Sequence, residues 1–495
     1  QTPFCKMDVA STQSMKSKIF VITCYALYSF FSTFDGNALN GILPLLEQNF
    51  NINDVEAASL KTANTIVYTA TLAVLWISGD YFQRRKLFLS SIGLWIVLSL
   101  LSIFLGSETF AIFVTFRALS TGAYSISGVL VPVMVADMFQ DRALGISLMA
   151  LTGCDIISGN FVGIISSWIV TSGAPWQSGL VVGPLLSIIP LLGLLCVDNR
   201  PDKVKNIEGR SIQKSLRGAL GLFSIKSVVL QTAVMALDMF HVVAYGFFFP
   251  SMVLAAMDAY PEVFLGQSYT MVTTFFIVIK LAGTVIGMPM TLWFAQTWRH
   301  GSGLCSRYDE NLRAFPIVMS AGALLKSCAY VAAFLLLAVS YPAFLVAMFL
   351  IGFGAAAGIS LGMQSMIMVA PTNSRTSAVA LARLIAGVVT TPAAQLIGLI
   401  SDTLRGDSTL PYDRFHSYQL ALLCSVLFAF ASALCDVILV FFFKQDCERA
   451  EYQSKEEEDV SVDESSFLIG SPKVRCESLL EASVRSRTAT ASSYY

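Results

Sequence analysis

Two charged residues inside long apolar runs are the side chains best placed to do chemistry in this chain. Asp35 lies in the apolar run 19–46, and Arg117 lies in the run 109–136. Charges at membrane depth are costly, so they normally face a cavity or a partner charge and mark a transport pathway. We predict that Asp35 pairs with Arg117, and that protonation of Asp35 releases Arg117 and shifts a conformational equilibrium. A purely structural pair that holds two helices together is compatible with this prediction.

The composition indicates a membrane protein. Of the 495 residues, 55% are hydrophobic and only 13% are charged, and the mean hydropathy is +0.67. Apolar runs long enough to span a bilayer recur throughout. The net charge of −1 gives no reason to expect a nucleic-acid partner. The cysteines show no zinc-type spacing, and no nucleophile elbow, HExxH or phosphate loop is present, so we expect no metal, no cofactor and no enzyme activity.

The spacing of the apolar runs predicts an all-α membrane protein with twelve transmembrane helices. The expected spans are 19–46, 57–79, 87–106, 109–136, 143–170, 178–197, 226–256, 267–294, 314–339, 341–369, 377–400 and 417–443. The longest connection, 198–225, is polar and basic, and it separates two six-helix bundles, 19–197 and 226–443. The flanking segments are 1–18 and 444–495; the second is acidic and serine-rich, which predicts a disordered tail.

The distribution of positive charge predicts the orientation in the membrane. Connections on the side of the termini hold most of the Lys and Arg residues, whereas the opposite connections hold only Arg405 and Arg414. Basic loops stay in the cytoplasm, so both termini are expected to be cytoplasmic.

The connection between the second and third spans, 79–86, reads GDYFQRRK. Basic flanking of a cytoplasmic loop would by itself explain its charge. It also resembles the conserved loop of the major facilitator superfamily, whose acid pairs with a neighbouring helix and holds the outward-open state. Trp76 and Gln83 stand where that motif usually has glycine. The residues that the resemblance implies for this latch are Asp80, Arg84 and Arg85.

Several segments spread over roughly residues 20–440 are similar to one lipid-transporter family within that superfamily, the Spinster family. These segments are Asp35 with 41–44 and 50–52, the loop that begins at 79, 117–132 with 136–139, 371–376 and 398–402. The resemblance implies a proton-linked carrier of lysophospholipids or of sphingoid lipids such as sphingosine 1-phosphate, with Asp35 as proton acceptor and Arg117 as its partner. Tyr124 stands where the family usually has an acid, and Gly36 where it usually has arginine.

Further charged residues lie inside the apolar runs. Asp238 and His241 are three residues apart and share a helix face. We expect Asp238 to pair with Lys280, and Lys280 or Arg117 to bind a phosphate; buried structural pairs are an equally good interpretation. Arg383, near the end of its span, is expected to snorkel toward the membrane surface. The candidate substrate-binding residues are Tyr124, Asp155, Asp238, His241, Tyr245 and Lys280.

Two unusual runs lie in the second half. The aromatic run 245–250 is typical of helix packing, with an acyl-chain path or a cation–π site for choline as the functional interpretation. The glycine-rich run 352–358 predicts close approach of neighbouring helices rather than a phosphate loop. In the tail, the acidic dileucine pattern of Glu464, Leu468 and Ile469 predicts binding to endosomal and lysosomal sorting adaptors.

Together these features predict a proton-coupled exporter of lysophospholipids in the lysosomal or late endosomal membrane. Three alternatives stay open: an exporter of sphingosine 1-phosphate or another sphingolipid at the plasma membrane, a facilitator for a small polar solute, and a transporter-like receptor that has lost coupling. An aromatic, laterally open site would favour lipid, and a closed site lined by amides and hydroxyls would favour a sugar.

Overall fold

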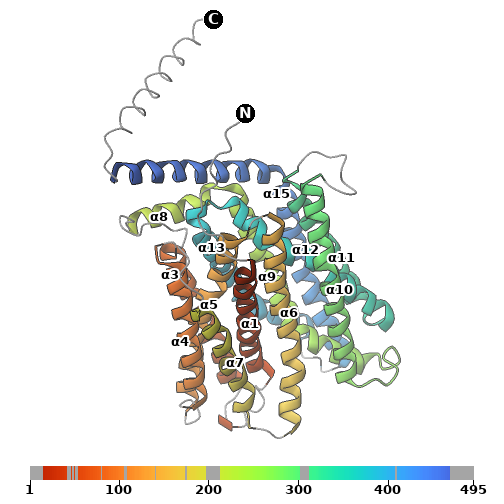
Figure 1. The fold of residues 1–495 in the computed structure, drawn as a ribbon. Helices are drawn as coiled ribbons and strands as arrows, with labels where there is room; N and C mark the ends of the chain where they lie inside the picture. The colour runs from red at the N-terminus through yellow and green to blue at the C-terminus, as the bar shows by residue number, and fades with distance from the viewer. Residues whose placement is uncertain are drawn as a thin grey trace, which may run out of the picture.

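The computed structural model describes residues 15–41, 46, 49–50, 54–79, 81–104, 109–139, 141–172, 175–196, 212–301, 311–406, 408 and 410–468. Within these residues the chain is helical throughout, as predicted, and contains no strand. The helices form two groups that lie side by side, one from each half of the sequence (Figure 1). Apolar segments in a membrane form helices because a helix satisfies the hydrogen bonds of its own backbone.

The first group contains six long helices. They are α1 (Met15–Gly41), α3 (Asp54–Ser78), α4 (Arg84–Phe104), α5 (Phe110–Met138), α6 (Asp141–Ser172) and α7 (Gln177–Cys196). Each coincides closely with one of the six predicted spans of the first bundle.

The predicted connection 198–225 is helical in its second part. It contains the short helix α8 (Ile212–Gly221) and the 3-10 turn η1 (Leu222–Ser224). Helix α8 packs against α3, and the ring of Phe223 meets that of Trp76 edge to face at 6.0 Å. This part of the connection is therefore anchored to the first group.

The second group follows the connection. Its elements are α9 (Lys226–Ala259), α10 (Tyr269–Arg299), α11 (Ala314–Leu336), α12 (Tyr341–Val369), η3 (Thr372–Ser374), α13 (Arg375–Thr390), α14 (Ala393–Arg405) and α15 (Pro411–Leu468). The predicted eleventh span, 377–400, is thus two helices rather than one. Pro392 lacks a backbone N–H and interrupts the helix at this point.

The helices have the length and surface of membrane spans. Eleven stretches of the described residues are long and apolar enough to cross a membrane, and one of them, Arg375–Arg405, comprises α13 and α14 together; α3 is apolar only over Thr62–Ser78 and falls short of that length. Large apolar side chains such as Val346 and Leu427 are 61% and 68% exposed on the perimeter. An apolar perimeter of this kind fits hydrocarbon rather than water. The chain is an integral membrane protein.

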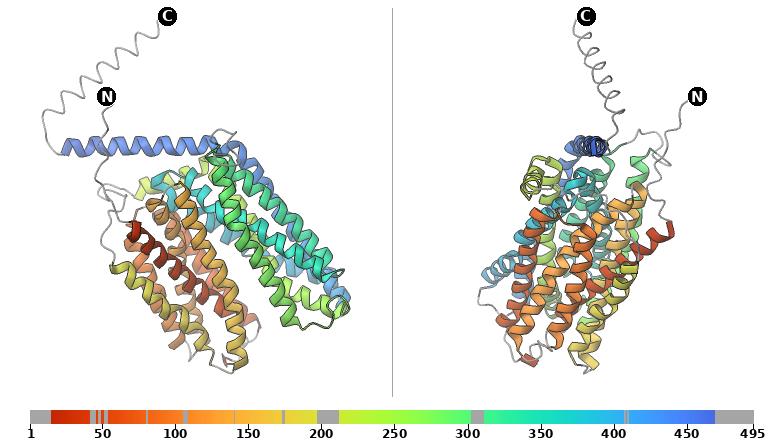
Figure 2. Two further views of the ribbon diagram at one scale, coloured as in Figure 1. Left: turned by 45° about the vertical axis from the view of Figure 1, so that its right-hand side comes forward. Right: turned by 60° about the vertical axis from the view of Figure 1, so that its left-hand side comes forward.

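Helix α15 differs from its predicted end at residue 443. It continues to Leu468 and turns along one end of the bundle, where it is drawn in blue (Figure 2). Cys447 is buried there among residues of both halves, and Lys444 lies 3.8 Å from Glu448 one turn away. This packing and the i, i+4 charge pair favour helix where composition alone predicted disorder. Residues 469–495 lie outside the described residues.

The two groups of helices contact each other at the end where α1 begins, which we call the basic end; the opposite end is the far end. Leu75 and Val133 of the first group share one buried apolar cluster with Leu361 and Val379 of the second. From there α6, in gold, and α10, in green, diverge toward the far end (Figure 2). The structure is therefore closed at the basic end.

The glycine-rich run of α12 allows the close helix approach that we predicted. A Cβ atom on Gly352 would lie 2.0 Å from the main-chain oxygen of Lys280 on α10, and one on Gly354 would lie 2.7 Å from that of Gly322 on α11. Larger residues cannot occupy these positions without moving the helices apart.

Candidate functional site

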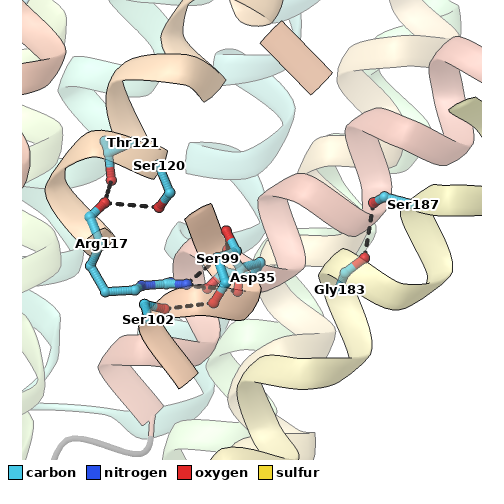
Figure 3. Close-up of polar contacts among 8 residues, drawn as sticks. All are labelled: Asp35, Ser99, Ser102, Arg117, Ser120, Thr121, Gly183 and Ser187. Atoms are coloured by element: carbon cyan, nitrogen blue, oxygen red, sulfur yellow. Dashed lines mark hydrogen bonds and ion pairs between the residues drawn. The ribbon is translucent and has the colours of Figure 1, made fainter. Parts of the chain in front are cut away.

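The predicted contact between Asp35 and Arg117 is present in the first half (Figure 3). The Nη1 atom of Arg117 lies 3.1 Å from each carboxylate oxygen of Asp35, and Nη2 donates to the main-chain oxygen of Asp35 at 3.3 Å. The two residues are 2% and 3% exposed. This is a buried, charge-assisted contact in which the fork of the guanidinium holds side chain and backbone together.

Neighbouring helices fix the position of this pair. Ser99 of α4 donates to the second carboxylate oxygen of Asp35 at 3.5 Å. Gly183 of α7 leaves room for α1, because a Cβ atom there would lie 2.8 Å from the Cβ of Asp35. Asp35 is thus enclosed by α1, α4, α5 and α7.

The chemistry of the pair is asymmetric. The guanidinium of Arg117 stays charged under all ordinary conditions, whereas the carboxyl of Asp35 can accept a proton. A protonated Asp35 would leave a buried cation without a counter-charge, which is costly in a medium of low dielectric. Protonation of Asp35 therefore favours a rearrangement around Arg117.

Asp155 of α6 lies against α1, on the side of the first half that faces the second. Its Oδ1 atom accepts hydrogen bonds from Ser29 at 2.5 Å and from Thr33 at 3.0 Å. Tyr124, which stands in place of the usual family acid, is half-buried nearby and interacts electrostatically with Asp155. The structure therefore brings together two of the predicted substrate-binding residues, one on α5 and one on α6.

Arg383 does not snorkel, and that prediction is wrong. Its Nη1 atom lies 2.7 Å from where a Cβ atom on Gly128 of α5 would stand, so the guanidinium reaches across from α13 into the first half. There it interacts electrostatically with Asp155 and Tyr124. Its Nε atom is buried with no hydrogen-bond partner among the described residues. The absence of a side chain at Gly128 gives the arginine a path inward that its position in the sequence did not reveal.

The predicted pair of Asp238 and Lys280 is also wrong. Asp238 of α9 forms its ion pair with Lys326 of α11, a residue that our sequence analysis did not single out. The ammonium of Lys280 instead lies over the ring of Tyr245, 4.7 Å from the ring centre. The geometry is that of a cation–π contact.

His241 and Tyr245 lie in the core of the second half. Nδ1 of His241 is 2.9 Å from Oγ of Ser425 on α15, and the imidazole meets the ring of Tyr330 edge to face at 4.3 Å. Tyr245 is 6% exposed within an aromatic core cluster that also contains Phe249. The run 245–250 therefore contributes to helix packing, as its composition most often indicates.

A polar cluster joins the two halves at the basic end, where the latch was predicted. Arg84 forms an ion pair of 2.8 Å with Asp137 of α5, and it donates to Thr376 at 3.1 Å and to the main chain of Thr372 at 3.2 Å. Arg375 of α13 lies 3.8 Å from the other oxygen of Asp137. The cluster holds the start of α4 and the end of α5 against η3 and α13.

The three residues predicted for the latch have different positions. Arg84 is buried at the centre of this cluster. Arg85 donates to the main-chain oxygen of Leu194 on α7, within its own half. Asp80 lies outside the described residues. In the sorting pattern, Ile469 also lies outside them, and Glu464 and Leu468 belong to the last turns of α15.

Sequence reasoning missed four charged residues of these clusters: Asp137, Lys326, Arg375 and Asp436. Lys326 and Asp436 lie inside predicted spans, so the criterion that identified Asp35 would have found them. Asp137 and Arg375 lie at span ends, where a charge is unremarkable without knowledge of its neighbours.

A comparison with protein families decides the classification. The sequence profile described as "Major Facilitator Superfamily" matches residues 25–307. The chain belongs to this superfamily. Members of the superfamily are transporters rather than enzymes, which agrees with the prediction made from the sequence.

Relatives of this superfamily member confirm the expected Spinster resemblance. The chain is 23% identical over 321 residues to "Protein spinster" of Drosophila melanogaster, a match that covers 63% of this chain and 51% of the relative. It is 23% identical over 195 residues to "Sphingosine-1-phosphate transporter SPNS2" of Xenopus tropicalis, covering 37% of this chain and 38% of that protein. The matched part thus covers about half of the fly protein and less than half of the frog protein.

Solved structures confirm the fold. The proton:xylose symporter XylE superposes with a TM-score of 0.59 at 15% identity, covering 84% of this chain and 96% of the symporter. A bacterial homologue of the human lysosomal transporter Spinster, in an inward-facing conformation, gives a TM-score of 0.57 at 14% identity, covering 88% and 99%. The chain therefore has the fold of the major facilitator superfamily.

Proposed function

We propose that this protein is a proton-coupled lipid transporter that exports lysophospholipids from the lysosome by alternating access. The observation that carries the proposal is the buried pair of Asp35 and Arg117, because it offers one group that can accept a proton and one that cannot lose its charge. The similarity to Spinster proteins supports a lipid as cargo. The neighbour described as a homologue of a lysosomal transporter supports the location.

In this proposal, a proton on Asp35 couples to the movement of the two halves. Protonation removes the counter-charge of Arg117, and the pair then favours a different packing of α1 against α5. The clusters at the basic end must separate when the site opens on that side, so Arg84 and Asp137 act as the latch. The equilibrium between the two states is set by the difference in these contacts.

The cargo head group is proposed to bind between Arg383 and the face of the first half that carries Asp155 and Tyr124. Arg383 extends from α13 across the interface, and its Nε atom has no protein partner among the described residues. A guanidinium suits a phosphate oxygen, since it offers several donors in one plane. Lys280 supplies a second cation on the face of the second half.

The basic end is proposed to face the cytoplasm. Arg84, Arg313 and Arg375 lie at this end, and basic residues concentrate on the cytoplasmic side of membrane proteins. In that orientation the structure is closed to the cytoplasm, and the pattern of Glu464, Leu468 and Ile469 is proposed to bind sorting adaptors on that side. The lysosomal lumen is acidic, which supplies the proton gradient for export.

The first alternative cargo is sphingosine 1-phosphate, carried across the plasma membrane. The similarity to the frog protein named as a transporter of that lipid favours it. It shares an anionic phosphate with the lysophospholipids, so Arg383 suits both cargoes. A polar-solute facilitator rests only on the fold shared with the xylose symporter.

Uptake into proteoliposomes tests this function. Labelled lysophosphatidylcholine and labelled sphingosine 1-phosphate are offered with and without a proton gradient to the wild type, Asp35→Asn and the pair-neutral double variant Asp35→Asn/Arg117→Gln. We expect gradient-stimulated uptake of a lipid by the wild type only. If the wild type, folded and monodisperse, takes up neither lipid, the lipid assignment is wrong and the polar-solute or receptor alternatives take its place.

A further inference from the structure

A second buried cluster of charges lies in the C-terminal half, where three helices each contribute one residue. Asp238 of α9 and Lys326 of α11 form an ion pair, and Asp436 of α15 interacts electrostatically with both. Asp436 is 3% exposed. Its Oδ1 atom is buried and has no hydrogen-bond partner within the described part of the chain. Lys326 is thus paired with one carboxyl group and interacts electrostatically with a second.

Among the described residues, no neighbouring group forms an ion pair with Asp436. On α9, His241 has its Nδ1 atom on Ser425 and a buried Nε2 atom without a partner among the described residues. On α11, Tyr330 stacks edge to face against His241. On α10, Lys280 lies over Tyr245 and interacts electrostatically with Lys326.

The charge balance determines how many protons the cluster holds. Lys326 can compensate one carboxylate, and a second buried carboxylate without a partner is strongly unfavourable. Two buried acids beside one counter-charge therefore favour the state in which one of them holds a proton and the other is ionised. With Asp238 paired to Lys326, this proton belongs on Asp436.

The two acids also differ in access. The side chain of Asp238 is 25% exposed, and that of Lys326 is 9% exposed. Asp436 is more buried than either of them. A proton can therefore reach the cluster from the side of Asp238, and the flexible side chain of Lys326 can move toward whichever carboxylate is ionised.

We propose that Asp238, Lys326 and Asp436 form a second proton-binding site of this transporter, separate from the pair of Asp35 and Arg117. In the empty site both acids are ionised around Lys326, and the net charge is −1. One proton from water binds to a carboxylate, the O–H bond forms on Asp436 at equilibrium, and the site becomes neutral. The inference goes beyond the proposed function, since it concerns proton binding by the protein itself and holds for any cargo.

Infrared difference spectroscopy of the full-length protein in lipid tests the site without any transport. Spectra recorded across a pH titration contain a carbonyl band for each carboxyl group that gains a proton. We expect Asp436→Asn to lose one such component that Asp35→Asn retains. Asp402→Asn is the matched control, because Asp402 is an exposed acid of α14 whose side chain is 70% exposed. Its spectrum should lose no buried component.

Asp238→Asn tests whether Lys326 pairs with Asp436 when Asp238 no longer carries a charge. Lys326 is then free to pair with Asp436, so the same component should disappear although Asp436 is still present. Asp436→Glu keeps a carboxyl group and should keep the component, shifted in frequency. A spectrum of Asp436→Asn that equals the wild type, or a component that persists at every pH, would overturn the proposal.

Proton stoichiometry gives an independent readout in proteoliposomes. Asp436→Asn should carry fewer protons per lipid than the wild type while lipid still moves down its own gradient. An unchanged ratio would contradict a transport role for the site. If the wild type carries no lipid, only the proposed function fails, because the infrared titration is unaffected.

Discussion

The two halves of this transporter each carry an acid within their first long helix, but they pair it differently. In the N-terminal half, Arg117 contacts both carboxylate oxygens and the main chain of Asp35. In the C-terminal half, Lys326 contacts Asp238 through one oxygen and also interacts electrostatically with a second acid, Asp436. We call the contact of Asp35 with Arg117 a closed pair, because one cation serves one acid. We call the second arrangement a shared pair, because one cation interacts with two acids.

This difference has consequences for how each half responds to a proton. Arginine is permanently charged and holds its partner through a planar fork, so the first pair has two well-separated states. Lysine is a point charge on a flexible stem, so it can follow whichever acid is ionised. The first half is therefore suited to a conformational switch, and the second to storing a proton without a large movement.

Breaking the closed pair should cause the greatest loss in the free energy of unfolding. Asp35→Asn leaves the cation of Arg117 buried without a counter-charge, and the free energy of unfolding should fall by about 3–5 kcal/mol. Asp238→Asn should cost about 1–2 kcal/mol, since Lys326 keeps Asp436 as a partner. Thermal unfolding of the purified variants measures both. Equal losses for the two substitutions would contradict the distinction between a closed and a shared pair.

Replacing each cation by the other type of basic residue should cause a smaller loss in the free energy of unfolding. Arg117→Lys removes the fork that contacts the side chain and backbone of Asp35, and it should lower the free energy of unfolding by about 1.5–3 kcal/mol. Lys326→Arg keeps the charge and still reaches an acid, so its loss should be smaller. The same unfolding assay distinguishes them. A loss for Lys326→Arg as large as that for Arg117→Lys would show that the second cluster is as rigid as the first.

The glycines that support the two clusters provide a steric comparison. A Cβ atom on Gly183 would lie 2.8 Å from the Cβ of Asp35, and one on Gly354 would lie 2.8 Å from the main-chain nitrogen of Lys326. Gly183→Ala and Gly354→Ala should each cost about 1–3 kcal/mol by overpacking. Gly358→Ala on α12 is the control, since it meets nothing within 4 Å. Unfolding temperatures equal to that of the control would show that these helices can shift freely.

The smallest expected effect concerns Ser99. Its hydrogen bond to Asp35 is long, at 3.5 Å, and Arg117 already contacts the same carboxylate oxygen. Ser99→Ala should therefore change the free energy of unfolding by less than about 1 kcal/mol. A larger loss would mean that the serine, rather than Arg117, holds the carboxylate in place.

The apolar runs of the sequence predict most of the helices. The first pair could also be predicted, because a charged residue within an apolar run is easily recognised. Asp35 and Arg117 stand nearly alone in their runs, so their contact could be inferred. The second cluster could not be assembled in this way: several charges lie in the spans of the second half, and only the packed helices show that Lys326, not Lys280, reaches Asp238. Helix neighbours are set by side-chain packing across the bundle, which apolar spacing does not encode.

Other differences have local causes. The helix break at Pro392 could have been predicted from the proline itself. The path of Arg383 depends on the missing side chain at Gly128, a residue far away in the sequence. The continuation of α15 follows the burial of Cys447 in an apolar cluster that contains residues of both halves, which the acidic composition of the segment does not reveal.

Asp35 and Arg117 are proposed to couple lipid movement to proton movement. Coupling is tested by following lumenal pH and lipid content together in proteoliposomes, with a lipid gradient and no imposed pH gradient. We expect lysophosphatidylcholine to move protons in the wild type, and Asp35→Asn/Arg117→Gln, with both charges removed and the protein still folded, to move none. Lipid transport by the wild type without any change in lumenal pH would contradict it.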